Sequence, residues 1–135
     1  MATFTLSVVA PDRAVVETEA TSVIAPGVDG YFGVMASHVP IVSVLRAGLL
    51  EYQDSNLQRN FVAIGGGFAE FSGNKMTILA DSADLAEEID VARETAALER
   101  ARKALRGEDS TMTAEQATAE LDRAMNRLRA AKAKS

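Results

Sequence analysis

The chain changes character within residues 75–93, KMTILADSADLAEEIDVAR, where a strand-like pattern gives way to a helical one. Residues 75–79 form one strand-like arm of a predicted hairpin, whereas residues 84–90 contain four acids and no base. Acids at such a density suit the positive end of a helix dipole. Eight of the nine glycines precede residue 84, where turns between strands need them. We therefore divide the chain into two parts, residues 1–83 and residues 84–135.

Short apolar segments separated by polar turns fill the first part. Phe4, Leu6 and Val8 alternate with smaller or polar residues, which is the period of a half-buried strand. Strand-like segments flank residues 54–56 and 72–74, and each arrangement predicts a hairpin. Strands that recur every 8–12 residues or so indicate an all-β sandwich or barrel.

The second part reads as two helices. Residues 84–135 are rich in Ala, Glu, Arg and Leu, which favour helices. Gly107 supplies a left-handed residue that ends the first helix, while Thr113 and Gln116 form a capping box that starts the second. The short link makes the two helices antiparallel neighbours. One face of the second helix carries a seam of small apolar residues: Ala114, Ala117, Leu121, Ala124, Leu128 and Ala131.

A seam made largely of alanine buries little apolar area, at about 0.8 kcal/mol for each methylene-sized group. The hairpin should therefore be marginal by itself. Two interpretations follow equally from these residues: the helix pair opens, or it simply docks on the first part.

The composition excludes several classes of protein. A net charge of −5 over 135 residues argues against a nucleic-acid partner, because such proteins present a basic face. The absence of cysteine excludes disulfides and thiol nucleophiles. No apolar run approaches the roughly 20 residues of a membrane span, and the first residues do not resemble a signal peptide. We expect a soluble, intracellular protein.

The candidate catalytic motifs have structural explanations. Gly65-Gly66-Gly67 precedes Phe68 between two strand-like segments, so a strand crossing or a bulge fits better than a phosphate loop, which leads into a helix. His38 is the only histidine, and it has neither further histidines for a metal site nor the context of a nucleophile elbow. No pair of acids is placed for general acid–base catalysis. We expect no catalytic residue and no metal site.

Charge is unevenly distributed over the helical part. Residues 84–90 are acidic, whereas residues 123–135 contain five bases and no acid. The two ends lie near each other in an antiparallel hairpin. The polarity is explained equally well by matching of the helix dipoles and by a basic arm for an acidic protein surface.

Residues 30–40, GYFGVMASHVP, resemble the signature of the epsilon subunit of F-type ATP synthases. Further blocks similar to that family follow in the same order along the chain: LRAG at 45–48, VAIGGGFAE at 62–70, LADSA at 79–83 and IDVAR at 89–93. Together they span the chain.

The resemblance implies a ten-stranded N-terminal sandwich followed by a C-terminal antiparallel helical hairpin. It implies a non-catalytic rotor subunit of the central stalk, which couples proton translocation to ATP synthesis. The implied partners are the gamma subunit and the c-ring, with Tyr31 and His38 on that side, although Tyr31 replaces an acid of several members. The implied location is the cytoplasmic face of the bacterial inner membrane, without direct insertion.

The resemblance also implies that the hairpin regulates the complex. In the family it folds against the sandwich or extends into the catalytic α3β3 hexamer, where it inhibits ATP hydrolysis. Arg123, Arg127 and Arg129 match the residues that meet the catalytic β subunit. The sequence does not distinguish a folded hairpin from an extended one.

Some family members bind ATP in the folded hairpin, so ATP is an implied regulatory ligand although no cofactor is required. The matching residues are Ile89, Asp90, Arg93, Arg100, Arg123 and Arg127. Glu94 replaces an alanine of the motif, and its carboxylate would repel a polyphosphate. Two other functions stay open on the residues alone: a free-standing nucleotide-sensing domain, and an adaptor whose hairpin docks some other protein.

Overall fold

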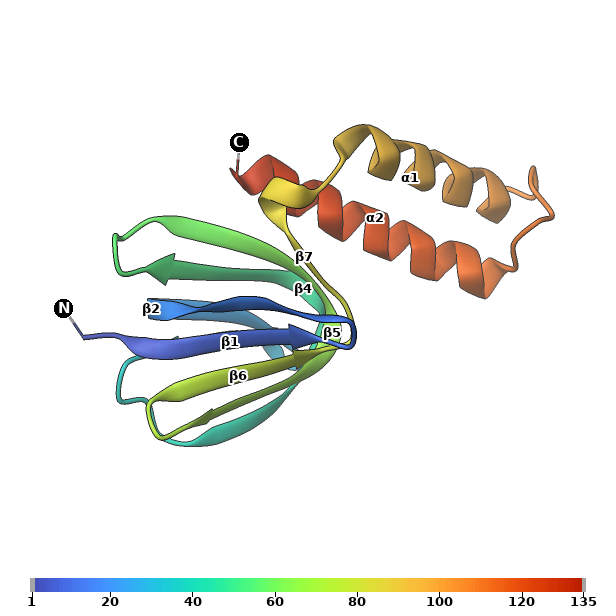
Figure 1. Ribbon diagram of the computed structural model, residues 1–135. Helices are drawn as coiled ribbons and strands as arrows, with labels where there is room; N and C mark the ends of the chain where they lie inside the picture. The colour runs from blue at the N-terminus through green and yellow to red at the C-terminus, as the bar shows by residue number, and fades with distance from the viewer. Residues whose placement is uncertain (1, 135) are drawn as a thin grey trace.

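The computed structural model describes residues 2–134 and shows a β-barrel with a two-helix hairpin at one end (Figure 1). The strands are β1 (Phe4–Ala10), β2 (Arg13–Gly27), β3 (Gly30–Met35), β4 (Ile41–Asp54), β5 (Arg59–Ser72), β6 (Lys75–Ala80) and β7 (Ala83–Leu85). A 3-10 turn, η1 (Ala86–Glu88), leads to α1 (Val91–Leu105) and α2 (Ala114–Lys134). The prediction of an all-β part followed by an antiparallel helical hairpin is confirmed.

The sheet closes on itself. Its order is β1-β6-β5-β4-β2-β3, and β1 also pairs with β2, so five strands form a ring. β1 is antiparallel to β2 and parallel to β6, while β3 extends the sheet beyond β2 and β7 pairs with β5. Closure pairs both edges of β1, which an open sandwich would leave as a free edge.

The expected ten strands are corrected to seven. β2, β4 and β5 are 15, 14 and 14 residues long, more than twice the usual strand length of about five or six residues, so the chain has fewer and longer strands than expected. β4 contains residues 41–45 and 49–53, and its pairing with β5 continues on both sides of Arg46. Because this pairing keeps one register across Arg46, β4 does not end there.

Both predicted hairpins are confirmed. β4 and β5 pair from Gln53 and Arg59 onward. β5 and β6 pair from Ser72 and Lys75, with Gly73 and Asn74 between them at φ values of 58° and 56°. Two positive φ values in a two-residue loop are typical of the type I′ turn, whose twist matches that of the strands.

The triple-glycine segment lies inside β5. Its pairing with β4 keeps one register from Leu45–Gly67 to Ala47–Gly65, so the segment is continuous strand and contains no bulge. The φ value of Gly67 is +139°, and a Cβ atom there would overlap the carbonyl oxygen of Leu79. The strand therefore approaches β6 more closely than any side chain would allow. No helix follows the segment, so it is not a phosphate loop.

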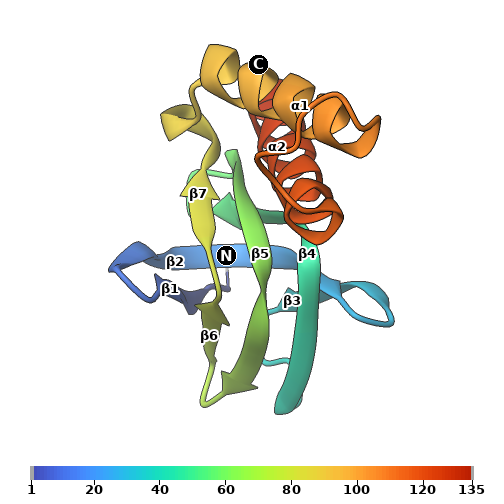
Figure 2. The same ribbon diagram turned by 90° about the vertical axis from the view of Figure 1, so that its right-hand side faces the viewer.

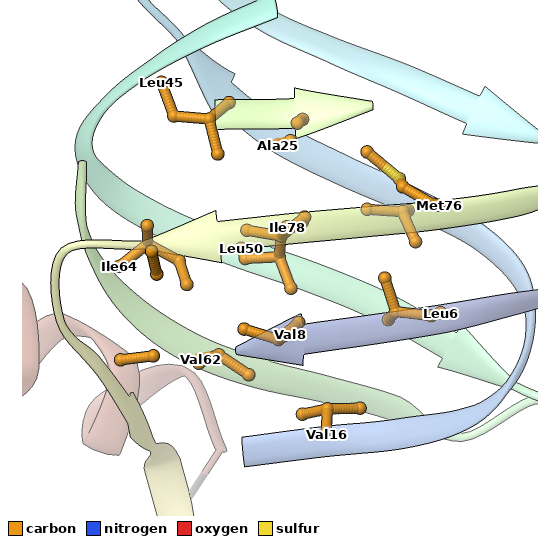
Figure 3. Packing of buried hydrophobic residues seen from close by; sticks show 14 of the residues in the cluster. Leu6, Val8, Val16, Ala25, Leu45, Leu50, Val62, Ile64, Met76 and Ile78 are labelled. Carbon is orange, nitrogen blue, oxygen red and sulfur yellow. The ribbon is translucent and has the colours of Figure 1, made fainter. Parts of the chain in front are cut away.

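The barrel interior is filled by apolar side chains of the strands (Figure 3). Six residues that point inward are fully buried: Leu6, Val8, Leu50, Val62, Ile64 and Ile78. Full burial of each such side chain contributes about 1.5–3 kcal/mol, so the barrel has a core that does not depend on the helices.

The helix ends form as the sequence predicts. Thr113 N–H donates to Gln116 Oε1 at 2.9 Å, and Gln116 N–H donates to Thr113 Oγ1 at 3.1 Å. At the end of α1, Gly107 has a φ value of +79°. The amides of Gly107 and Glu108 reach back to carbonyls of α1 at 3.1 and 2.9 Å, which is the Schellman arrangement.

The predicted seam is confirmed in part. Ala117 and Ala124 of α2 are buried, as is Ala101 of α1, whereas Ala114 is exposed. α2 also contacts β4 and β5, and Ala130 packs on Phe61 of β5. Figure 2 shows α2 beside the upper part of β4, with α1 across the top of the molecule.

Candidate functional site

The predicted arginines converge on one groove between the two helices. The groove has a volume of about 360 Å³. Arg93 and Arg100 come from α1, and Arg123 and Arg127 come from α2. An i,i+4 spacing keeps Arg123 and Arg127 on one helix face, and the antiparallel hairpin sets that face against α1.

A second hollow of about 310 Å³ adjoins this groove at the start of α1. Ile89 and Asp90 line it, and Arg93, Glu94 and Arg127 line both hollows. The six residues of the implied ATP site therefore border two connected hollows. Asp90 already has a local role, because its carboxylate caps α1 by accepting from Arg93 N–H at 3.2 Å.

Arg127 is held by two carboxylates. Its Nε donates to Asp84 Oδ2 at 2.9 Å, and its Nη1 donates to Glu94 Oε1 at 3.3 Å. Burial lowers the pKa of Arg127, but the hydrogen bonds and charges of Asp84 and Glu94 outweigh it and leave that pKa raised. The guanidinium therefore stays charged, and Glu94, the departure from the family motif, is one of its partners.

The other arginines of the groove differ in their partners. Arg100 forms an ion pair with Glu120 of α2. Arg93 and Arg123 form no ion pair within residues 2–134. Among the described residues, Arg93 and Arg123 are thus the unpaired cations of the groove. Arg100 and Arg127 are paired with acids of the same chain. The acidic and basic ends of the hairpin lie together, as the sequence indicates.

Asn126 attaches α2 to the barrel, and the sequence analysis missed it. Its Nδ2 donates to the carbonyl oxygens of Gly48 at 2.8 Å and Ile64 at 3.1 Å. The residue is buried, and its Oδ1 has no partner among the described residues. Asparagine is a poor helix former, so its place within an alanine-rich helix is the signal that could have indicated a tertiary role.

The three residues matched to the β-subunit contact do not share one exposed face in this docked hairpin. Arg129 lies two residues beyond Arg127 and is exposed beside a different hollow, which Arg46 and Asp122 line. The side chain of Arg127 is 24% exposed. Their role against a β subunit stays a prediction.

Tyr31 lies near the start of β3, and His38 lies three residues after the end of β3. The Tyr31 hydroxyl accepts from Leu49 N–H at 3.0 Å, and the Arg46 guanidinium stacks over its ring. The His38 ring packs edge-on against Phe71 at a centroid distance of 5.8 Å. Both side chains thus have structural contacts, and their part in a c-ring or gamma contact stays a prediction.

An apolar row crosses the outer surface of the barrel. Val44, Phe68 and Leu79 are paired in register on β4, β5 and β6, and they are 46%, 54% and 56% exposed. Val42 adds to this outer apolar row on the same face. Contiguous exposed apolar surface of this kind marks interaction sites. No helix within residues 2–134 is long and apolar enough to cross a membrane.

Comparison with known protein families gives a match over almost the whole chain. The beta-sandwich domain of the ATP synthase delta/epsilon chain matches residues 3–86, and the long alpha-helix domain of the same chain matches residues 87–132.

Curated relatives and solved structures agree with these matches. The "ATP synthase epsilon chain" of Moorella thermoacetica is 41% identical over 131 residues, covering 97% of this chain and 98% of the relative. That of Symbiobacterium thermophilum is 43% identical over 132 residues, covering 97% and 94%. A chain of the Euglena gracilis mitochondrial ATP synthase structure, OSCP/F1/c-ring, has a TM-score of 0.74 at 25% identity, covering 99% of this chain and 82% of that one. The chain belongs to the ATP synthase delta/epsilon chain family.

Proposed function

We propose that this chain is the epsilon subunit of an F-type ATP synthase, where it forms part of the central-stalk rotor and couples proton translocation to ATP synthesis. The observation that carries the proposal is that both parts of the chain, barrel and hairpin, match that family in order. The chain is a stalk and regulatory subunit and not a catalytic one. The match along the whole chain does not favour a free-standing sensor or an adaptor.

The gamma subunit is the proposed partner of the barrel, and the outer apolar row is the proposed contact. A cross-strand row with an aromatic residue at its centre has the character of an interface anchor. Tyr31 and His38 would contribute on the side of the c-ring. The complex would hold the chain at the cytoplasmic face of a bacterial inner membrane through its partners, without insertion.

The test is binding of the purified chain to a purified gamma subunit. We expect Phe68→Asp to weaken binding by at least about tenfold, because a charge would be desolvated in the interface. Leu57→Asp is the matched control, since Leu57 is 51% exposed at the β4–β5 turn, outside the row. Equal binding by both variants would refute the assigned surface, and no binding by the unmodified chain would refute the rotor function.

The hairpin is the proposed regulatory part. When docked it lies against the barrel, and when extended it would reach the α3β3 hexamer, with Arg123, Arg127 and Arg129 toward the β subunit. Deletion of residues 84–135 should raise ATP hydrolysis by the reconstituted complex while leaving the barrel assembled. Unchanged hydrolysis would remove the inhibitory role.

ATP is the proposed regulatory ligand of the arginine groove. Arg93 and Arg123, which have no ion pair among the described residues, are the groups able to meet its phosphates, and Glu94 opposes them. A rise in melting temperature with ATP should disappear in Arg123→Ala. Arg123 is the better choice for this test because changing Arg127 would disturb the fold without any ligand. A shift that persists in Arg123→Ala would exclude the groove as the site.

A further inference from the structure

One guanidinium connects three separate parts of the molecule. Arg127 belongs to α2, Glu94 belongs to α1, and Asp84 belongs to β7, which is paired with β5 of the barrel. The contacts of 2.9 and 3.3 Å therefore join the barrel and both helices at a single point.

Glu94 is an unusual residue in this position. It is 7% exposed, and a buried carboxylate is strongly unfavourable unless a cation and hydrogen bonds compensate it. Arg127 is the cation that it contacts among the described residues. Arg127 therefore compensates the buried charge of Glu94 in the docked hairpin.

The rest of the attachment between hairpin and barrel is small. The apolar part consists of Phe61, Ala63, Ala86 and Ala130, with Leu49 and Ile89 at its edge. Three of these side chains are single methyl groups, which bury little area. The charged cluster and the neighbouring Asn126 thus provide much of the geometric specificity of docking.

We infer that Asp84 and Glu94 act as an internal anionic ligand of Arg127, which keeps the hairpin docked on the barrel without any bound ligand. The innermost arginine of the groove is then occupied by the chain's own carboxylates, at the place where an external anion would otherwise bridge the helices. This inference rests on the regulatory movement proposed above for the hairpin. The docked state is then stabilised by ion pairs within the chain and does not require ATP.

Amide hydrogen exchange of the purified full chain tests the inference. Undocked helices with an alanine seam fray, so exchange in α2 reports even a rarely populated undocked state. Glu94→Gln keeps the size of the side chain and removes its charge. We expect exchange in α2 to become about tenfold faster, as for loss of a charge-assisted hydrogen bond, while exchange in the barrel strands stays unchanged and shows that the variant is folded.

Glu99→Gln is the matched control, because Glu99 lies on the same helix in an exposed pair with Arg102; its α2 exchange should stay within about twofold of the unmodified chain, as exposed pairs contribute little. The acceleration by Glu94→Gln should also disappear in an Arg127→Gln background, since the partner is gone. Unchanged α2 exchange in Glu94→Gln, or full acceleration in that background, would overturn the inference. No other ATP synthase subunit takes part in this experiment, so its failure is distinguishable from failure of the rotor function.

Discussion

Replacement of Asn126 by alanine should release the hairpin from the barrel without unfolding the barrel. The side chain donates two hydrogen bonds to barrel carbonyls, at 2.8 and 3.1 Å. Each contributes about 1 kcal/mol net, which gives about 2 kcal/mol for the pair. Alanine favours the helix by about 0.5 kcal/mol over asparagine, so about 1.5 kcal/mol of docking free energy is lost. That loss changes the docking equilibrium about tenfold.

Energy transfer between two labels measures docking directly. The chain contains no cysteine, so cysteines introduced at the exposed positions Asp29 and Ala133 carry the labels without background. Urea should separate the labels at a lower concentration in Asn126→Ala, while circular dichroism shows the barrel unfolding at its usual concentration. The buried core of the barrel, to which the hairpin contributes little, is the reason to expect two transitions.

Two further variants make the result interpretable. Asp122→Ala changes an exposed residue one turn earlier on α2 and should dock like the unmodified chain. Asn126→Asp presents a carboxylate to the two carbonyl oxygens and should undock more completely than the alanine variant. The reasoning is refuted if Asn126→Ala separates at the same urea concentration as the unmodified chain, because the two hydrogen bonds would then contribute nothing to docking.

Three other expectations follow from single residues. Gly67→Ala should destabilise the barrel by roughly 3 kcal/mol or more, as expected for a clash combined with a positive φ, because its Cβ would overlap the Leu79 carbonyl. Thermal unfolding measures this loss. A melting temperature within about a degree or two of that of the unmodified chain would contradict it. The pKa of Asp54 is lowered mainly by the Gln58 amide, so its carboxylate stabilises the fold above its unfolded pKa, and that stabilisation is lost as the pH falls through the folded pKa. Urea unfolding at a series of pH values should show this loss in the unmodified chain and not in Asp54→Asn; parallel pH profiles would speak against it. Glu94→Ala should bind ATP about tenfold more tightly than the unmodified chain by titration calorimetry, since a like charge leaves the groove, and weaker binding would argue that Arg127 needs Glu94 for its orientation.

Much of the secondary structure follows from local chemistry and was predictable for that reason. The turn at Gly73 and Asn74, the Schellman end at Gly107 and the capping box at Thr113 each depend on residues within a few positions of one another. The division after residue 83, which rests on the placement of glycines and helix formers along the chain, stays a prediction; β7 (Ala83–Leu85) runs across it.

The number of strands was not predictable in the same way. A polar or glycine-containing break resembles a turn when it is read locally, yet β5 continues through Gly65–Gly67. β4 pairs with it on both sides of Gly66, while β7 pairs with the residues before the glycines and β6 with the residues from Gly67 onward. Closure of the barrel depends in addition on β1 meeting β6 about seventy residues later in the chain, from Thr5 and Lys75 onward. Such pairings arise from distant partners, which periodicity does not reveal.

The sequence by itself determined a β part, a helical hairpin with an alanine seam, and an arginine-rich last helix near an acidic start. Only the tertiary structure decided which of those arginines form ion pairs with acids of the same chain. Asp84 reaches Arg127 across 43 positions, and Asn126 reaches Gly48 across 78. Charge and hydrogen-bonding capacity are properties of single residues, but burial and partnership exist only after distant segments have packed together.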